Sequence, residues 1–141
     1  MIALLLLQVM LGTLPRQAAP AMGCAAYLFT RADTPQFVAM AGPGGLRLSL
    51  DGHEVALART GAEGSTARGL PALAHYAGGG VEATLTLAAS DRGDLADGAL
   101  VTEATLTVAR AGADTIVAPL GGLIGCAAAT AEGAADAGRR R

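Results

Sequence analysis

The chain has 141 residues and a formal net charge of -2, from ten basic and twelve acidic residues. Nucleic-acid-binding proteins normally carry a clustered basic surface. The only arginine cluster here is the terminal triplet at 139–141, so we expect no nucleic-acid partner. The length fits a single domain. Alanine supplies much of the 52% hydrophobic content, so few large apolar side chains are left to form the core.

The N-terminus has the pattern of an export signal. Residues 1–14 form an apolar run that is broken at only three positions. The run is too short to span a bilayer, which needs about 20 apolar residues, but it has the length of a signal-peptide core. Ala19, Pro20 and Ala21 supply an A-x-A cleavage site, so we expect residues 1–21 to be a cleaved signal peptide. The mature protein is then periplasmic or secreted, without a transmembrane span. A basic n-region is missing, and a buried N-terminal helix of a cytosolic protein is the alternative.

The two cysteines lie at the two ends of the expected mature domain. Cys24 comes just after the cleavage site, and Cys126 follows the last apolar stretch. An oxidising compartment permits a disulfide between them. It would close a loop of about 100 residues and stabilise the fold by up to about 4.7 kcal/mol in the chain-entropy model. Residues 21–24 also resemble a bacterial lipobox, so lipidation of Cys24 and a membrane anchor are the alternative.

Residues 46–57 give the clearest local signal, a β-hairpin. Apolar and polar residues alternate on both sides of Asp51 and Gly52, a dipeptide that favours a type I′ turn because both central residues need positive φ. The expected cross-strand pairs are Leu50 with His53, Leu48 with Val55, Leu46 with Leu57 and, on the polar face, Ser49 with Glu54. We expect His53 at the rim of the buried face.

Alternation along the rest of the chain predicts further short strands. Residues 81–87 and 103–108 alternate apolar residues with threonine and glutamate, as one-sided antiparallel strands do. Residues 27–30, 36–40 and 115–120 are further candidates, and the last is expected to end around Pro119 and the Gly121-Gly122 pair. Residues 70–76 are expected to form at most a short helical turn. About six to seven short strands at close spacing favour an all-β domain, a small antiparallel β-sandwich or barrel.

The expected organisation has three parts. A signal segment at residues 1–21 precedes one β domain at residues 22–126. Residues 127–141 form a C-terminal tail that is rich in alanine, glycine and arginine and lacks large apolar side chains, which is the composition of a disordered segment.

Few residues offer catalytic or ligand-binding chemistry. His53 and His75 are the two histidines, and histidine acts as a base near neutral pH without perturbation. Asp91, Asp94 and Asp97 place three carboxylates on one glycine-containing loop, a composition that could hold Ca²⁺. Their spacing differs from that of an EF-hand loop, and the bidentate glutamate is absent. We expect a solvated loop there, no cofactor, no bound metal and no catalytic residues.

In its general organisation the chain is similar to the small periplasmic lysozyme inhibitors of the membrane-bound type, which have an export signal, a compact antiparallel barrel and cysteines near the domain ends. That family carries a Ser-Gly-x-x-Tyr type loop that plugs the lysozyme active site. Residues 64–69, with Ser65 and Arg68, match this loop loosely. The resemblance covers the architecture and this one loop, and it implies lysozyme inhibition as one possible function.

The sequence favours an exported, non-enzymatic module that binds an envelope protein or a glycan. This interpretation depends on the combination of an export signal with a β scaffold that has no recognisable catalytic motif. A lysozyme-inhibitor-like protein is the first alternative. A small hydrolase or metal-dependent enzyme that uses His53 and His75 is the second.

Overall fold

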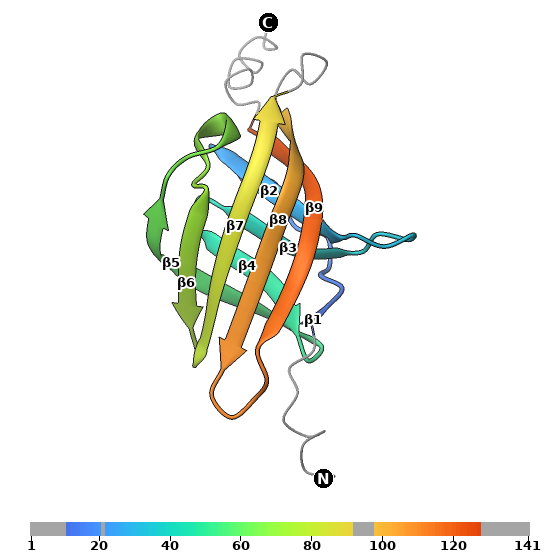
Figure 1. Ribbon diagram of the computed structural model, residues 1–141, viewed down its shortest axis with the longest axis vertical. Coiled ribbons are helices and arrows are strands. Elements are labelled where there is room, and N and C mark those ends of the chain that lie inside the picture. The colour runs from blue at the N-terminus through green and yellow to red at the C-terminus, as the bar shows by residue number, and fades with distance from the viewer. Residues whose placement is uncertain (1–10, 21, 92–97, 128–141) are drawn as a thin grey trace, which may run out of the picture.

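Alternating apolar residues and tight turns fold the chain into antiparallel strands that close into an eight-stranded barrel with one extra strand (Figure 1). The computed structural model describes residues 11–20, 22–91 and 98–127. The strands are β1 (Leu11–Gly12), β2 (Cys24–Thr30), β3 (Phe37–Gly42), β4 (Gly45–Leu50), β5 (His53–Glu63), β6 (Leu73–Gly78), β7 (Val81–Asp91), β8 (Gly98–Arg110) and β9 (Ile116–Cys126). Each strand from β2 to β9 pairs with the next, β9 pairs back with β2, and β1 pairs with the end of β4.

The expected hairpin is confirmed. All four predicted pairs between β4 and β5 are present. Asp51 and Gly52 have φ values of 53° and 83°, positive at both central positions as the type I′ turn requires. His53 is exposed beside this turn. Ser49 is expected on an exposed polar face, but it is buried at the point where Gly12 of β1 pairs with it beyond the end of β3.

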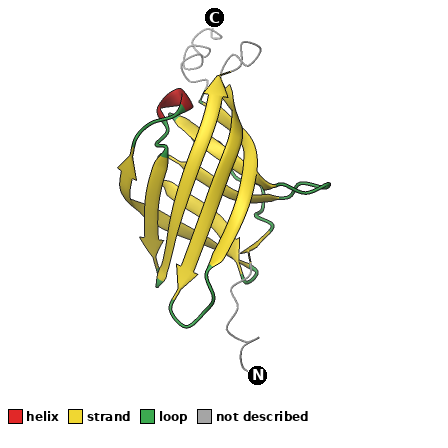
Figure 2. Cartoon of the chain, viewed as in Figure 1, coloured by secondary structure: helices red, strands yellow, loops and turns green. Residues whose placement is uncertain are grey.

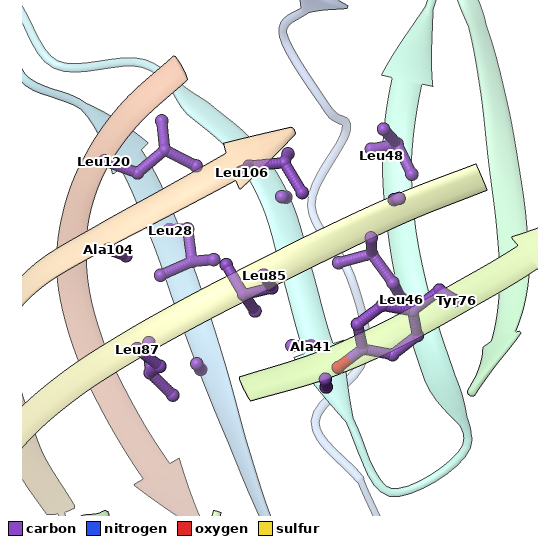
Figure 3. Packing of buried hydrophobic residues seen from close by; sticks show 14 of the residues in the cluster. Leu28, Ala41, Leu46, Leu48, Tyr76, Leu85, Leu87, Ala104, Leu106 and Leu120 are labelled. Carbon is purple, nitrogen blue, oxygen red and sulfur yellow. The ribbon is translucent and has the colours of Figure 1, made fainter. Parts of the chain in front are cut away.

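The interior of the barrel is filled by aliphatic side chains. The largest fully buried side chains are Leu28, Leu46, Leu48, Leu57, Leu106, Leu120 and Val108. Figure 3 shows leucines from β2, β4, β7, β8 and β9 meeting inside the barrel, with smaller side chains such as Ala41 and Ala104 between them. The alternating runs expected at residues 81–87 and 103–108 provide two of these inward faces. The core therefore depends on leucine, with alanine filling the smaller spaces between the larger side chains.

Two segments differ from the sequence-based expectation. Residues 73–78 form strand β6 instead of part of a helical turn, and a single 3-10 turn (η2, Ala67–Gly69) precedes it. β9 continues through Pro119 and Gly122 to Cys126. Pro119 is tolerated because β2 pairs with β9 only from Leu120 onward, so the preceding part of β9 has an open edge.

Gly122 is required by a close approach between β9 and β2. A Cβ atom at this position would overlap the carbonyl oxygen of Tyr27. A similar constraint applies to Gly45, where a Cβ would overlap the carbonyl oxygen of Leu57 and φ is +139°. These glycines allow the neighbouring backbones to approach closely. They belong to strands, although their sequence context resembles that of turns.

Most connections between the strands lie at the two ends of the barrel, and the loop between β2 and β3 projects from its side (Figure 2). One end holds η2, the end of β7 and the start of β8. The other end holds the Asp51-Gly52 turn, where Asp51 Oδ2 lies 2.8 Å from Arg110 Nη2. Within the described residues, no helix is long and apolar enough to cross a membrane.

Candidate functional site

The two histidines lie on different parts of the barrel surface. His53 begins β5, and His75 lies in β6 opposite Gly61 of β5. The stretch of β5 between positions 53 and 61 spans roughly 25 Å at about 3.3 Å per residue. Both side chains are exposed. The residues on which the enzyme alternative depends are therefore not brought into one site.

Tyr76 is adjacent to His75 in the sequence but points to the opposite side of β6. His75 is on the outside, where its Nδ1 lies 3.4 Å from Thr84 Oγ1. Tyr76 is 3% exposed and lies inside the barrel (Figure 3). Burial raises the pKa of the Tyr76 hydroxyl above its usual value of about 10, and the charge of Arg59 lowers this pKa by a smaller amount. Tyr76 is thus a buried neutral phenol that cannot share a ligand site with His75.

Tyr76 also lines a small cavity, of about 10 Å³, near the end of the barrel that holds η2. Arg59, Leu70 and Leu87 are among the other lining residues. This volume corresponds to about one water molecule. The barrel interior at this point is therefore too small for a larger ligand unless the surrounding residues move.

Of the three carboxylates of the acidic loop, Asp91 is the one within the described residues. Asp91 ends β7, and its Oδ1 lies 2.9 Å from Arg68 Nε. Asp94 and Asp97 lie outside the described residues. Within the part of the chain that the structure describes, no three His, Cys, Asp or Glu side chains form a group that could hold a metal ion. The observed role of Asp91 is to hold Arg68.

Residues 64–69, which resemble the lysozyme-inhibitor loop, lie at one end of the barrel and are anchored there. Arg68 donates through Nη2 to the carbonyl oxygen of Gly98 at 3.0 Å, in addition to its ion pair with Asp91. The Thr66 hydroxyl accepts from the Ala89 amide at 3.0 Å. Ser65 is exposed beside these anchors. The loop is fixed on β7 and β8, and it presents Ser65 to solvent.

Cys24 and Cys126 form the expected disulfide. They lie directly opposite each other, at the start of β2 and the end of β9. Pairing continues past the bond, since the Ala127 amide donates to the Gly23 carbonyl oxygen at 2.9 Å. The disulfide therefore lies on the seam that closes the barrel. Lipidation of Cys24 would use the same sulfur atom as the disulfide, so one chain cannot carry both.

A surface that sequence reasoning missed lies on the outside of β2, β3 and β9. Tyr27 and Phe29 flank the inward Leu28, and Phe37 lies beside them with ring centroids 6.2 Å from Tyr27 and 5.4 Å from Phe29. Leu123 is directly opposite Tyr27 and is 49% exposed. We call Tyr27, Phe29, Phe37 and Leu123 the aromatic face. Two-residue alternation around a buried Leu28 is the signal that could have placed these aromatic rings outside.

Residues 11–20, which belong to the predicted signal segment, lie against the barrel beside the aromatic face. We call them the strap. Leu11 pairs with Leu50, and the Leu14 amide donates to the Phe37 carbonyl oxygen at 2.7 Å. Leu14 is 2% exposed. The strap therefore pairs through its backbone with the end of β4 and packs Leu14 onto the outside of β2 and β3.

The described surface thus offers an aromatic face, an adjoining strap and an anchored loop at one end. No family model matches the chain, and neither the curated proteins nor the solved structures provide a match.

Proposed function

We propose that the chain is an exported, disulfide-closed β-barrel module that binds an envelope protein or a glycan and does not catalyse a reaction. The observation that carries this proposal is the aromatic face. Of the four aromatic residues in the chain, three lie on the outside of the barrel, at Tyr27, Phe29 and Phe37.

These three rings are half-buried and lie against one another on the barrel surface. The barrel interior is built mainly from aliphatic side chains, with Tyr76 as its aromatic member, whereas Tyr27 and Phe37 pack against a separate cluster on the outside. Aromatic residues provide large, rigid contact area at interfaces and are enriched among residues that dominate binding. Leu123 extends the same surface onto β9. This arrangement supports binding through the side of the barrel.

A pair of exposed aliphatic residues on one strand allows a controlled test. Leu123 belongs to the aromatic face, whereas Val117 is 64% exposed at the other end of β9, opposite Thr107. The processed chain is labelled and mixed with isolated envelope particles from the native host. We expect Leu123→Asp to reduce the retained fraction several-fold and Val117→Asp to leave it unchanged. Protease or glycosidase treatment of the particles then distinguishes a protein partner from a glycan.

Equal loss in both variants, or loss in neither, would contradict binding through the aromatic face. Intact mass of the protein from its native host, with and without reduction, tests export, the cleavage position and the state of Cys24 together. A chain that keeps residues 1–21 would contradict export by signal cleavage. Turnover of any substrate that is abolished by His53→Ala or His75→Ala would contradict the non-enzymatic part of the proposal.

The anchored loop favours a second candidate function, inhibition of lysozyme. Ser65 is exposed next to Thr66 and Arg68, which fix the loop on the barrel end. A fixed protruding loop loses little entropy on binding. Lysozyme activity is measured with the wild-type chain and with the Ser65→Ala/Arg68→Ala double variant. Inhibition by the wild type that is lost in the variant supports this candidate, and no inhibition by the wild type excludes it.

A further inference from the structure

The strap occupies a site that has three distinct parts. The first part is a backbone edge: Leu11 and Gly12 pair antiparallel with Leu50 and Ser49 of β4. β3 pairs with β4 only as far as Leu48, so the strap continues the sheet where β3 has ended. An extended peptide that adds to an open strand edge gains main-chain hydrogen bonds in the same way.

The second part is an apolar pocket on the outside of the barrel. Leu14 is buried against Ala25 and Met40, and Tyr27 and Phe37 pack around it. These residues form a cluster separate from the barrel core. Two of them, Tyr27 and Phe37, belong to the aromatic face. We call this place the Leu14 pocket.

The third part is a groove along the β3–β4 hairpin. Residues 17–20 form one wall of a half-open cavity of about 350 Å³, and residues 42–47, Met40, Ala56 and Leu57 form the rest. Arg47 Nη1 donates to Gln17 Oε1 at 3.2 Å across this groove. The same guanidinium nitrogen lies 3.5 Å from Glu54 Oε2. The groove thus combines apolar walls with one cationic donor.

We propose that this surface is a binding groove for an extended segment of another polypeptide, occupied in the unprocessed chain by its own strap and opened by signal cleavage. The inference rests on the proposed export, because cleavage after Ala21 would remove the whole strap. Removal would leave Ser49 and Leu50 without their pairing on the strap side of β4, and the Phe37 carbonyl oxygen without the Leu14 amide. It would also open the Leu14 pocket next to the aromatic face.

The strap itself defines the chemistry of the segment that fits. Its backbone is extended, a leucine fills the apolar pocket, and a side-chain acceptor three residues later reaches Arg47. A partner segment therefore carries Leu or Met at the first of these positions and Gln or Glu at the second. A carboxylate at the second position would gain a charge-assisted hydrogen bond from Arg47. Gly42 and Gly45 line the groove, which leaves room for prolines such as Pro20 in the strap.

The test compares chains in which the groove is covered and open. A fluorescently labelled peptide of residues 11–20 is titrated, by fluorescence anisotropy, into the unprocessed wild-type chain, the processed chain from the exporting host and the unprocessed Leu14→Asp variant. A tethered strap competes at an effective concentration that is often in the millimolar range. We expect the processed chain and the Leu14→Asp variant to bind the peptide at least about tenfold more tightly than the unprocessed wild type.

Pro15→Asp is the matched control, because Pro15 is an exposed position of the same strap and is not among the residues that line the groove; this unprocessed variant should bind the peptide as weakly as the wild type. A peptide with Asp in place of its leucine should not bind any chain. Equal peptide affinity in all chains, or no binding to the processed chain and the Leu14→Asp variant, overturns the groove. Dimers of the processed chain that the peptide dissociates would show that a second copy is the occupant, and they also overturn the proposal. If the native host retains residues 11–20, the proposal of export by signal cleavage is contradicted. The comparison of peptide binding between the wild-type chain and the Leu14→Asp variant then still decides whether the groove binds a peptide.

Discussion

The Cys24–Cys126 disulfide is expected to be a major source of stability in this barrel. The bond joins positions separated by 102 residues. In the chain-entropy model, a cross-link that closes a loop of about 100 residues removes conformational freedom from the unfolded chain that is worth about 4.7 kcal/mol at 25 °C. Whole domains are stable by about 5–15 kcal/mol. The bond therefore accounts for a third or more of the expected total.

The native state should change little when the bond is lost. Ala25 and Ala26 of β2 still pair with Gly125 and Ile124 of β9, next to the disulfide. We therefore expect Cys24→Ala/Cys126→Ala to keep the barrel and to lose about 4 kcal/mol of unfolding free energy. With a urea slope of about 2 kcal/mol per M, the unfolding midpoint falls by about 2 M.

The measurement is equilibrium urea unfolding of the oxidised wild type, the reduced wild type and the double variant, followed by circular dichroism. The reduced wild type is the control, since it keeps both half-buried cysteine side chains and loses only the bond. Both altered chains should lose similar stability. A loss below about 1 kcal/mol in the reduced wild type would refute the loop-entropy reasoning. A much larger loss in the double variant alone would assign the effect to side-chain packing.

Three further outcomes follow from the fold. Gly45→Ala should lower the free energy of unfolding by about 2 kcal/mol or more in the same urea assay, because the new Cβ would overlap the Leu57 carbonyl oxygen. Gly44→Ala is the control: its Cβ would meet open space, so its free energy of unfolding should stay within about 0.5 kcal/mol of the wild-type value. Leu106→Ala should cost about 2–5 kcal/mol, since the side chain is fully buried, and a loss under 1 kcal/mol would contradict a close-packed interior. Burial raises the pKa of Tyr76, which means that the folded state holds the phenol proton more tightly than the unfolded state. The unfolding free energy of the wild type should therefore fall relative to that of Tyr76→Phe as the pH rises above about 10. Identical pH dependence of the two unfolding free energies would show that the phenol is not buried.

The parts of the fold that could be predicted are those decided by neighbours in the sequence. The β4–β5 hairpin is specified by its Asp51-Gly52 turn, because two positive φ values fix the register of every following pair. The alternating runs in β7 and β8 identify their inward faces in the same way. Alternation does not reveal whether the sheet closes, since closure depends on the pairing of β2 with β9 across almost the whole domain.

The parts that could not be predicted depend on contacts between distant residues. Pro119 and Gly122 read as strand breakers, yet Pro119 lies on an open edge and Gly122 is needed where Tyr27 approaches β9. The separation of the two histidines has a similar origin. Their chemistry makes His53 and His75 candidates for one site, but their positions on β5 and β6 are set by strand pairing, which keeps them far apart.

The aromatic face and the strap could not be predicted from the sequence for a different reason. Tyr27 and Phe37 are apolar, and apolar residues in a strand are normally assigned to the interior. Only the closed barrel shows that the inward positions are already filled by residues such as Leu28. The composition of the strap predicts a signal segment, and it gives no indication that Leu14 packs on the barrel.

The pairing of β2 with β9 closes the barrel, so the set of strand pairs would be the same whichever strand began the chain. Cys24 and Cys126 are covalently joined, and each strand between them pairs with its two neighbours around the circle. A proteolytic cut in an exposed turn, such as the one at Gly79 and Gly80 between β6 and β7, would therefore release no fragment under oxidising conditions. For the same reason, a circular permutant that joins the two cysteine ends and begins at that turn would keep every strand pair of the barrel.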